Sequence, residues 1–378
     1  MSSSEKIMRP PPEIRNEEEL QALRQIDEGR LKPANWILSP KTVMTFIVGT
    51  KEPIKYLVEG QEKEILITRK FYGNDILIQR AIATIASNRS LLLIGEPGTA
   101  KTWLSEHLAA AISGNSLNII QGTAGTTEDQ IKYSWNYALL LAKGPCLEAM
   151  VAAPLYKGMK EGKIVRFEEI TRCPHEIQDT IISVLSDKVL TIPELPPPDD
   201  LLFASPGFNI IGTANTRDRG VNEMSSALKR RFNFETISPL DSIEEETILV
   251  TEQTERFLED AGIQTEVPPD VVELLTTTFN ELRSGVSEDG RQIDRPSAVM
   301  STAEAVDVNI NASLYSHYIE ETTLSPKSLV LNLVGTIVKE NQEDLEKLQN
   351  YFDIIIKARK DVNKYWDEYY KARKHLRW

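Results

Sequence analysis

The residues with the clearest chemical capacity lie in one segment, Gly-Glu-Pro-Gly-Thr-Ala-Lys-Thr at positions 95–102. The segment follows a short apolar run and precedes a helix pattern, which is the context of a phosphate-binding loop (P-loop). Gly95 and Gly98 allow the backbone to bend closely, so that N–H groups and a helix N-terminus can face a phosphate. Lys101 would place a cation on the β- and γ-phosphates of a nucleotide, and Thr102 would ligate Mg²⁺.

Every residue of this loop is therefore a candidate ligand of ATP. The set is Gly95, Glu96, Pro97, Gly98, Thr99, Ala100, Lys101 and Thr102. The usual pattern has Gly where this chain has Ala100. We treat this as a small departure, because an Ala side chain is small enough for the start of a helix.

A pair of acidic residues follows a second apolar strand pattern, Ile-Val-Arg-Phe at 164–167. Glu168 and Glu169 stand at the C-terminal end of this strand, the edge at which open α/β sheets hold ligands. We expect Glu168 to hold Mg²⁺ through water and Glu169 to orient or deprotonate the attacking water. The usual pair is Asp-Glu, so the longer Glu168 bears on the hydrolysis rate more than on nucleotide binding. Asn215, after a third strand pattern, could reach the water or the γ-phosphate.

Strand and helix patterns alternate from residue 71 to residue 240. This alternation predicts an α/β fold, a P-loop αβα sandwich in which helices cover both faces of a parallel sheet. The expected strands are 91–94, 117–120, 163–167 and 208–213, and the expected helices are 75–87, 101–113, 127–143 and 175–186. Two inserts, 144–162 and 188–206, interrupt the series, and the second has the pattern of a hairpin.

Residues 1–70 are expected to form a small N-terminal extension. A short amphipathic helix is expected over 17–28, and the stretch 36–68 has a β-rich pattern that begins with Val-Met-Thr-Phe-Ile-Val-Gly. The extension carries no chemical motif, so its expected role is to pack on the residues that follow.

Residues 241–340 have helical signals and predict an all-α lid domain. Asp241 is expected to cap the first helix, because acidic residues follow it in the first turn. A second helix is expected over 270–283 and a third from near Pro296. A loop rich in Gly, Asp and Pro at 284–296 separates them.

The last segment, 341–378, contains neither Gly nor Pro and repeats apolar residues at alternating steps of three and four. It predicts one long C-terminal helix of about 57 Å. Such a helix would pack on the lid or dock with a partner as a coiled coil. Basic and aromatic residues also mix over 357–378, which can indicate nucleic-acid binding but more often indicates an amphipathic face.

Composition limits the class of protein. The net charge is −13, which argues against a protein that coats nucleic acid or an anionic membrane. The two cysteines, Cys146 and Cys173, are too few for a disulfide framework and predict a reducing, cytoplasmic location. The start of the chain lacks the apolar core of a signal peptide. No apolar run approaches the ~20 residues of a membrane span.

The motifs together resemble those of the AAA+ ATPases, and within them the MoxR-like and dynein-related branch that includes the McrB motor. The resemblance covers about residues 71–310, and the inserts fall where this branch carries a helix-2 insert and a pre-sensor-1 hairpin. Glu168 departs from the expected Asp. The resemblance rests on GEPGTAKT (95–102), FEEITR (167–172), GTANTRDRG (212–220) and ALKRRF (227–232).

The resemblance implies further roles for single residues. Asn215 matches sensor 1, which monitors the γ-phosphate. Arg231, with Arg230 as the alternative, matches the arginine finger that completes the ATP site of a neighbouring subunit. Arg295 is the candidate for sensor 2, and Arg291 competes with it.

The resemblance also implies a function. It predicts an ATPase that uses ATP and Mg²⁺, assembles as a homo-hexameric ring and remodels protein complexes in a chaperone-like manner, in some members with a von Willebrand A-domain partner. Nucleic acid is not an expected partner. Two alternatives stay open: an NTPase motor directed by nucleic acid, as in McrB, and a nucleotide-gated scaffold with little turnover, which Glu168 suggests.

Overall fold

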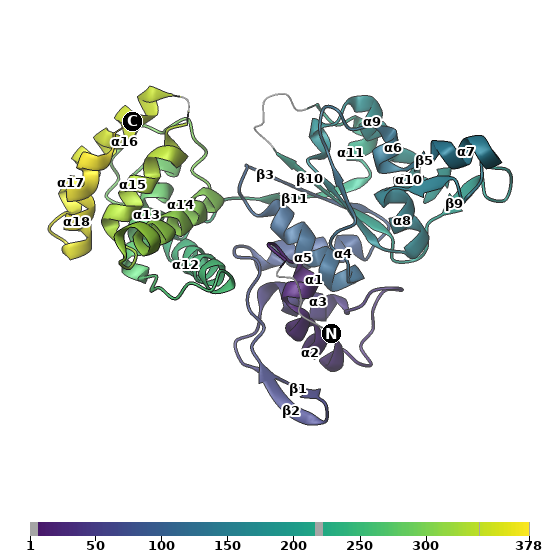
Figure 1. Ribbon diagram of the computed structural model, residues 1–378, viewed down its shortest axis with the longest axis horizontal. Helices are drawn as coiled ribbons and strands as arrows, with labels where there is room; N and C mark the ends of the chain where they lie inside the picture. Colours follow the sequence, from purple (N-terminus) through teal and green to yellow (C-terminus); the bar gives the residue numbers. More distant parts are fainter. Residues whose placement is uncertain (1–6, 216–221, 340, 378) are drawn as a thin grey trace. The chain divides into compact units, whose positions relative to one another are not determined.

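The computed structural model describes residues 7–215, 222–339 and 341–377, and the chain divides into two compact units (Figure 1). The α/β unit comprises Met1–Gly95 and Ala100–Ile237, and the helical unit comprises Glu96–Thr99 and Ser238–Trp378. Residues 216–220 of the motif at 212–220, and Trp378 of the basic and aromatic segment, lie outside the described residues. The four-part division of the sequence at residues 70, 240 and 340 stays a prediction.

A parallel five-stranded sheet with the order β11-β3-β10-β7-β4 forms the centre of the α/β unit. Its strands are β3 (Ser90–Gly95), β4 (Ile119–Gln121), β7 (Ile164–Glu168), β10 (Asn209–Asn215) and β11 (Phe232–Ile237). The predicted α/β fold class is confirmed. The edge strand β11 was not predicted, and its burial departs from its apolar–polar alternation, since Phe234 is exposed and Glu235 is buried.

Successive residues of these strands enter different cores, as the two-residue period of a strand requires. Leu91, Leu93 and Ile164 join one core together with residues of α4 (Asp75–Ile85) and α5 (Lys101–Ser113). Leu92, Val165 and Phe167 join the core on the other face. Both predicted helices are confirmed, and α5 runs directly from the P-loop.

The predicted helix over 127–143 is wrong as a continuous element. Residues 133–135 form a strand because they pair with 150–152 in an antiparallel ladder, and Asn136 then caps a new helix. The segment contains α6 (Glu128–Ile131), β5 (Tyr133–Trp135), α7 (Tyr137–Lys143), β6 (Met150–Ala152) and α8 (Pro154–Glu161). The helix predicted over 175–186 is likewise two short ones, α9 (His175–Asp179) and α10 (Ile182–Asp187). The predicted hairpin is confirmed as β8 (Val189–Thr191) and β9 (Leu201–Phe203).

The N-terminal residues include a helix where a β-rich pattern was predicted. Ser39 accepts a hydrogen bond from the Thr42 N–H and Pro40 occupies the first helical position, so Val-Met-Thr-Phe-Ile-Val starts and continues as a helix despite its β-branched residues. Phe46 and Ile47 enter the same core as α4 and α5. The elements are α1 (Pro12–Arg15), α2 (Glu17–Ile26), α3 (Pro40–Val48), β1 (Ile54–Val58) and β2 (Gln61–Ile65).

The helical unit contains α12 (Ile243–Asp260), α13 (Pro269–Ser284), α14 (Thr302–Tyr315), a π-helical turn (Ser316–Glu320) and α15 (Pro326–Ile337). Two predicted helix starts are wrong. Ser242, not Asp241, caps α12, because its hydroxyl accepts the Glu245 N–H. The third helix starts at Thr302 rather than near Pro296, because Ser301 and Glu304 form a capping box.

The C-terminal segment is helical, but the single long helix predicted for it is wrong. The chain turns after residue 359, and Asn363 caps a new helix by accepting the N–H groups of Tyr365 and Trp366. The apolar seam then packs into the core of the helical unit itself, with Leu348, Phe352 and Tyr369 buried there. The elements are α16 (Gln342–Tyr351), a π-helical segment (Phe352–Ile356), α17 (Lys357–Arg359), α18 (Lys364–Ala372) and a 3₁₀ turn (Arg373–His375).

A buried carboxylate at the end of α13 binds residues of the C-terminal hairpin, which is the helical hairpin formed by α16 to α18. Glu281 is 1% exposed and accepts hydrogen bonds from the Tyr351 hydroxyl at 2.6 Å and from the Glu288 N–H at 2.8 Å. The Arg359 guanidinium pairs with it through Nη1 at 3.1 Å and lies over the Trp366 ring. Burial and the nearby Glu281 carboxylate raise the pKa of Tyr351 well above its ordinary value.

Over the described ranges, no helix combines the length and the apolar character needed to cross a bilayer.

Replacing Arg359 tests the hairpin. The substitution Arg359→Met leaves the Glu281 charge buried without its cation, so we expect the free energy of unfolding, measured by urea denaturation, to fall by about 3 kcal/mol. The control Arg373→Met removes an exposed pair with Asp353 in the same hairpin and should cost less than about 1 kcal/mol. Equal losses would contradict this packing.

Candidate nucleotide-binding site

The P-loop joins β3 to α5 and enters the left-handed region of backbone space twice. Gly98 has φ of +75° and Ala100 has φ of +63°. Such changes of hand are typical of loops whose N–H groups bind anions. The departure at Ala100 therefore concerns backbone conformation rather than side-chain size: a non-glycine residue in this conformation costs about 1 kcal/mol.

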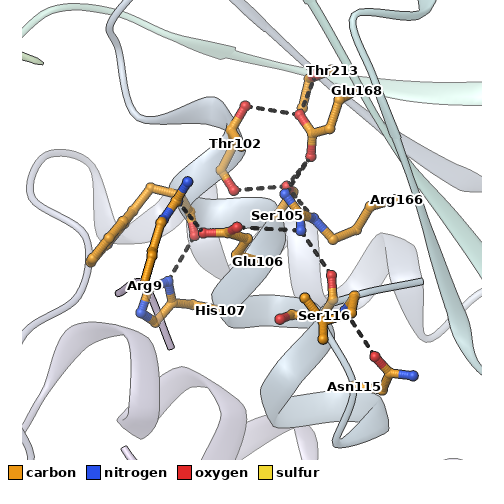
Figure 2. A network of polar contacts seen from close by, with 12 residues as sticks. Arg9, Thr102, Ser105, Glu106, His107, Asn115, Ser116, Arg166, Glu168 and Thr213 are labelled. Carbon is orange, nitrogen blue, oxygen red and sulfur yellow. Dashed lines mark hydrogen bonds and ion pairs between the residues drawn. The ribbon is translucent and has the colours of Figure 1, made fainter. Parts of the chain in front are cut away.

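Two P-loop side chains lie on the first turn of α5. Lys101 is buried and its ammonium group donates to the Gly95 carbonyl oxygen at 3.1 Å. The Thr102 hydroxyl donates to Glu168 Oε2 at 2.9 Å (Figure 2). Thr99 donates to the Glu96 carbonyl within the loop at 2.9 Å. The P-loop and the acidic strand are thus linked directly by Thr102 and Glu168.

The Glu168 carboxylate is 2% exposed and each of its oxygens accepts two hydrogen bonds (Figure 2). Oε2 accepts from Thr102 and, at 2.7 Å, from the Thr213 hydroxyl. Oε1 accepts from the Ser105 hydroxyl at 2.6 Å and from Arg166 Nη2 at 2.8 Å. These four donors fix the carboxylate between β7, β10 and α5.

Glu169 adopts a conformation that non-glycine residues rarely take, with φ of +53°. Its N–H donates to the Thr213 hydroxyl at 2.9 Å, and its carboxylate pairs with Arg172 Nε at 2.9 Å. Gly122 is required beside it, because a Cβ at that position would lie 2.3 Å from the Glu169 carbonyl oxygen. The unusual turn moves Glu169 out of the buried strand and leaves its side chain 30% exposed.

The carboxyl ends of the parallel strands bring the predicted residues to one edge of the sheet. Asn215 is in register with Gly95, where the P-loop begins, and Gln121 is in register with Glu168. The predicted set of P-loop, acidic pair and Asn215 is therefore gathered at this edge by β3, β7 and β10.

The two candidate arginine fingers lie at the opposite end of the sheet, where the parallel strands begin. Both precede β11, whose first residue Phe232 pairs with Ser90 at the start of β3. The Arg231 guanidinium donates to the Ala227 carbonyl at 2.6 Å and to the Ser186 hydroxyl. The Arg230 side chain is exposed. Neither arginine is brought to the P-loop edge of this sheet.

The two sensor 2 candidates belong to the helical unit. The Arg295 guanidinium donates to the Ser284 carbonyl at the end of α13, and its side chain packs on Gly285. Arg295 lies in the loop before α14, which corrects its expected place at a helix start. Arg291 is exposed and pairs with Asp289 at 3.0 Å.

Three residues of the site were not predicted: Arg166, Ser105 and Thr213. The sequence does carry a signal for Arg166, since a charged residue inside an otherwise apolar strand shares a face with the residue two positions later. That residue is Glu168. Thr213 and Ser105 have no such signal, because their roles depend on the order of β10 beside β7 and on how α5 covers the sheet.

The other reactive side chains have structural partners. The Trp103 indole donates to the Lys70 carbonyl at 2.7 Å, and its ring lies 4.5 Å from that of His107. Cys173 is buried, which raises the pKa of its thiol, and its carbonyl accepts from Asn222 and Gln178. These contacts and the burial of Cys173 fit packing roles for all three side chains.

The edge has the donors that a nucleotide with Mg²⁺ needs. Mg²⁺ binds through one or two protein oxygens together with phosphates and waters, and Thr102 and Glu168 offer one hydroxyl and one carboxylate. Across the described ranges, no group of three or more His, Cys, Asp or Glu side chains could hold a metal by itself. The arrangement therefore suits a metal brought with a phosphate ligand.

Each of the two units contains a segment that matches a known protein family. Residues 90–232 match the AAA domain of the dynein-related subfamily, and residues 244–377 match the YehL-like AAA+ ATPase C-terminal domain. The uncharacterized protein YehL of Escherichia coli is 47% identical over 370 residues, which is 98% of both chains. An uncharacterized protein of Staphylococcus aureus is 29% identical over 166 residues, 43% of this chain and 61% of that protein.

Solved structures show more distant similarity. NtrX from Brucella abortus in complex with ADP has a TM-score of 0.48 and 14% identity, over 81% of this chain and 64% of that chain. RuvB from Thermotoga maritima has a TM-score of 0.41 and 13% identity, over 77% of this chain and 76% of that chain.

Thr213 offers a test of the geometry that needs no nucleotide. Thr213→Val keeps the shape of the side chain but removes a donor from Glu168 and an acceptor from Glu169, so we expect the free energy of unfolding to fall by about 1–3 kcal/mol. The control is Thr236→Val, at an exposed position of β11 in the same sheet. Urea denaturation of both variants should separate them, and an unchanged Thr213→Val would contradict the bonding of Glu168.

Proposed function

Because the chain belongs to the AAA+ ATPases, with an AAA domain of the dynein-related subfamily and a YehL-like C-terminal domain, we propose that it binds ATP with Mg²⁺ and hydrolyses it to ADP and phosphate. The observation that carries the proposal is the meeting of Lys101, Thr102, Glu168 and Glu169 at one edge of the parallel sheet. The hydrogen bond between Thr102 and Glu168 at 2.9 Å supports a shared task for the P-loop and the acidic strand.

Each residue then has a role that its chemistry suits. The P-loop residues from Gly95 to Thr102 would bind the phosphates through backbone N–H groups, and Lys101 would exchange the Gly95 carbonyl for phosphate oxygens. Thr102 and Glu168 would hold Mg²⁺, which when bound neutralises charge on the β- and γ-phosphates. Glu169 would orient or deprotonate the attacking water, and Asn215 would contact that water or the γ-phosphate.

We further propose that the protein works as a ring, a homo-hexamer in which one subunit completes the site of the next. The support is the position of Arg230 and Arg231 at the edge of the sheet opposite to the P-loop. An arginine at this end of the sheet is held away from the P-loop of its own chain. It is therefore suited to act on the ATP of another subunit. Arg231 remains the first candidate and Arg230, with its exposed side chain, the second.

The finer assignments are proposals of the same kind. Arg295, or Arg291 in its place, would sense the γ-phosphate from the helical unit. The ring would remodel a protein complex in the manner of MoxR-like ATPases, with a von Willebrand A-domain protein as one kind of partner. Nucleic acid finds less support, because Tyr369 of the basic and aromatic segment is buried and Trp366 packs beneath Arg359.

Hydrolysis is tested with Glu169→Gln. Removing the base should lower ATP turnover at least about 100-fold while ATP binding persists. The matched control is Glu176→Gln, at an exposed position of α9 in the same unit, which should leave turnover unchanged. Phosphate release and binding of a fluorescent ATP analogue are the two measurements.

Three results would redirect this proposal. Wild-type turnover no higher than that of Glu169→Gln would favour the nucleotide-gated scaffold. Preference for GTP, or stimulation by DNA, would favour a motor directed by nucleic acid.

The arginine finger is tested by mixing two inactive variants. We expect Arg231→Ala to lower turnover about 1,000-fold with ATP binding retained, because it removes transition-state charge stabilisation. In a mixture with Glu169→Gln, some interfaces combine an intact Glu169 with an intact Arg231 of the neighbouring subunit, so activity should return. The same mixture with Arg230→Ala tests the alternative. If neither mixture regains activity although each single variant is inactive, action across subunits is wrong.

A further inference from the structure

An arginine is buried inside the strand that carries the acidic pair. Arg166 is 2% exposed and lies on β7 between Val165 and Phe167, whose side chains enter the core on the far face of the sheet. Arg166 instead shares its face with Glu168, two residues later, and this face is covered by α5. A charge at such a position needs partners, because an unpaired buried charge is strongly destabilising.

The guanidinium of Arg166 has partners on every side (Figure 2). Nη2 donates to Glu168 Oε1 at 2.8 Å and Nε donates to the Ser105 hydroxyl at 3.0 Å. Nη1 donates to the Ser116 carbonyl at 2.8 Å and lies 3.5 Å from Glu106 Oε1. These contacts fix the guanidinium behind Glu168, on the side away from Thr102.

The two oxygens of Glu168 consequently face different partners. Oε1 is held by Arg166 and Ser105, while Oε2 is directed to Thr102 and Thr213. A carboxylate can accept hydrogen bonds from both sets of donors only if its side chain has the right length. An aspartate is shorter by one methylene, about 1.5 Å, and could not serve both sets at once.

We propose that Arg166 is a positioning residue for Glu168, and that the glutamate at position 168 is the length this arginine requires. The inference rests on the proposed function, since the positioned oxygen Oε2 is the one that would hold Mg²⁺ beside Thr102. Arg166 anchors Oε1 and balances its charge, which leaves Oε2 in a fixed direction. Arg166, on the same strand, thus accounts for the glutamate in place of the usual aspartate.

The pairing is tested by a double-mutant cycle in the full chain. The variants are Arg166→Met, Glu168→Asp and the two combined, with Arg80→Met as the control. Arg80 forms a bidentate salt bridge with Glu235 in the same unit, away from Glu168. Two readouts need no turnover: the melting temperature without metal or nucleotide, and the Mg²⁺ concentration for half-maximal binding of a fluorescent ATP analogue in the Glu169→Gln background.

Arg166→Met should lower the melting temperature by about 5 °C or more, because it leaves the Glu168 charge buried without its cation. Glu168→Asp should also lower it, because the shorter carboxylate cannot reach both sets of donors. The combined variant should lose clearly less than the sum of the two losses, since the shorter carboxylate has already lost contact with Arg166 and removing the arginine then breaks fewer contacts. Glu168→Asp alone should raise the half-maximal Mg²⁺ concentration at least about fivefold, and adding Arg166→Met should bring it back to within about twofold of wild type. Arg80→Met should leave this concentration unchanged.

Two outcomes would overturn the proposal. Additive losses of melting temperature would mean that the two residues are not coupled. Coupled melting temperatures with an unchanged Mg²⁺ requirement in both single variants would reduce Arg166 to a structural role. If the wild-type protein shows no ATP turnover, the proposed function fails, while the melting cycle and the Mg²⁺ dependence of binding still decide the role of Arg166.

Discussion

The α/β unit depends on the burial of one carboxylate. Glu168 is 2% exposed, so its charge must be met by donors from several elements. Thr102 and Ser105 come from α5, Arg166 from β7 itself and Thr213 from β10. The same four bonds therefore fix the helix that follows the P-loop, the strand of the acidic pair and the neighbouring strand. The geometry of the site and the packing of the core are one arrangement.

The helical unit uses the same physics at Glu281. Its carboxylate, at the end of α13, holds Tyr351 and Arg359 from the C-terminal hairpin and the Glu288 N–H from the loop before α14. This loop also carries Arg291 and Arg295, and its far end is held where Asp344 of α16 accepts the Ser297 N–H at 2.9 Å. The YehL-like C-terminal region thus fixes the loop that carries both sensor 2 candidates.

The sequence predicts features that depend on local chemistry. It does not predict features that depend on which strands pair or on which helices pack together. The P-loop, the acidic strand end and the parallel sheet follow from motifs and from the alternation of apolar runs, and the structure contains them. The sequence does not predict the helix over 40–48, because its β-branched residues favour a strand and mask the cap at Ser39. The C-terminal heptad pattern describes a seam but not its partner, and Asn363 turns that seam back onto the core of its own unit. Thr213 could not be predicted without the order of β10 beside β7, and Ser105 could not be predicted without the packing of α5 on the sheet.

The shared direction of the parallel strands also separates the two ends of the sheet. The carboxyl ends of β3, β7 and β10 gather the P-loop, the acidic pair and Asn215, while the start of β11 places Arg230 and Arg231 at the other end. A parallel strand has a fixed direction, so no side-chain movement brings these arginines to their own P-loop. Any further cation at the γ-phosphate, beside Lys101, would therefore be supplied by residues other than Arg230 and Arg231 of the same chain. This separation is the physical basis of the proposed ring, in which Arg231 or Arg230 of one subunit would act on the ATP of the next.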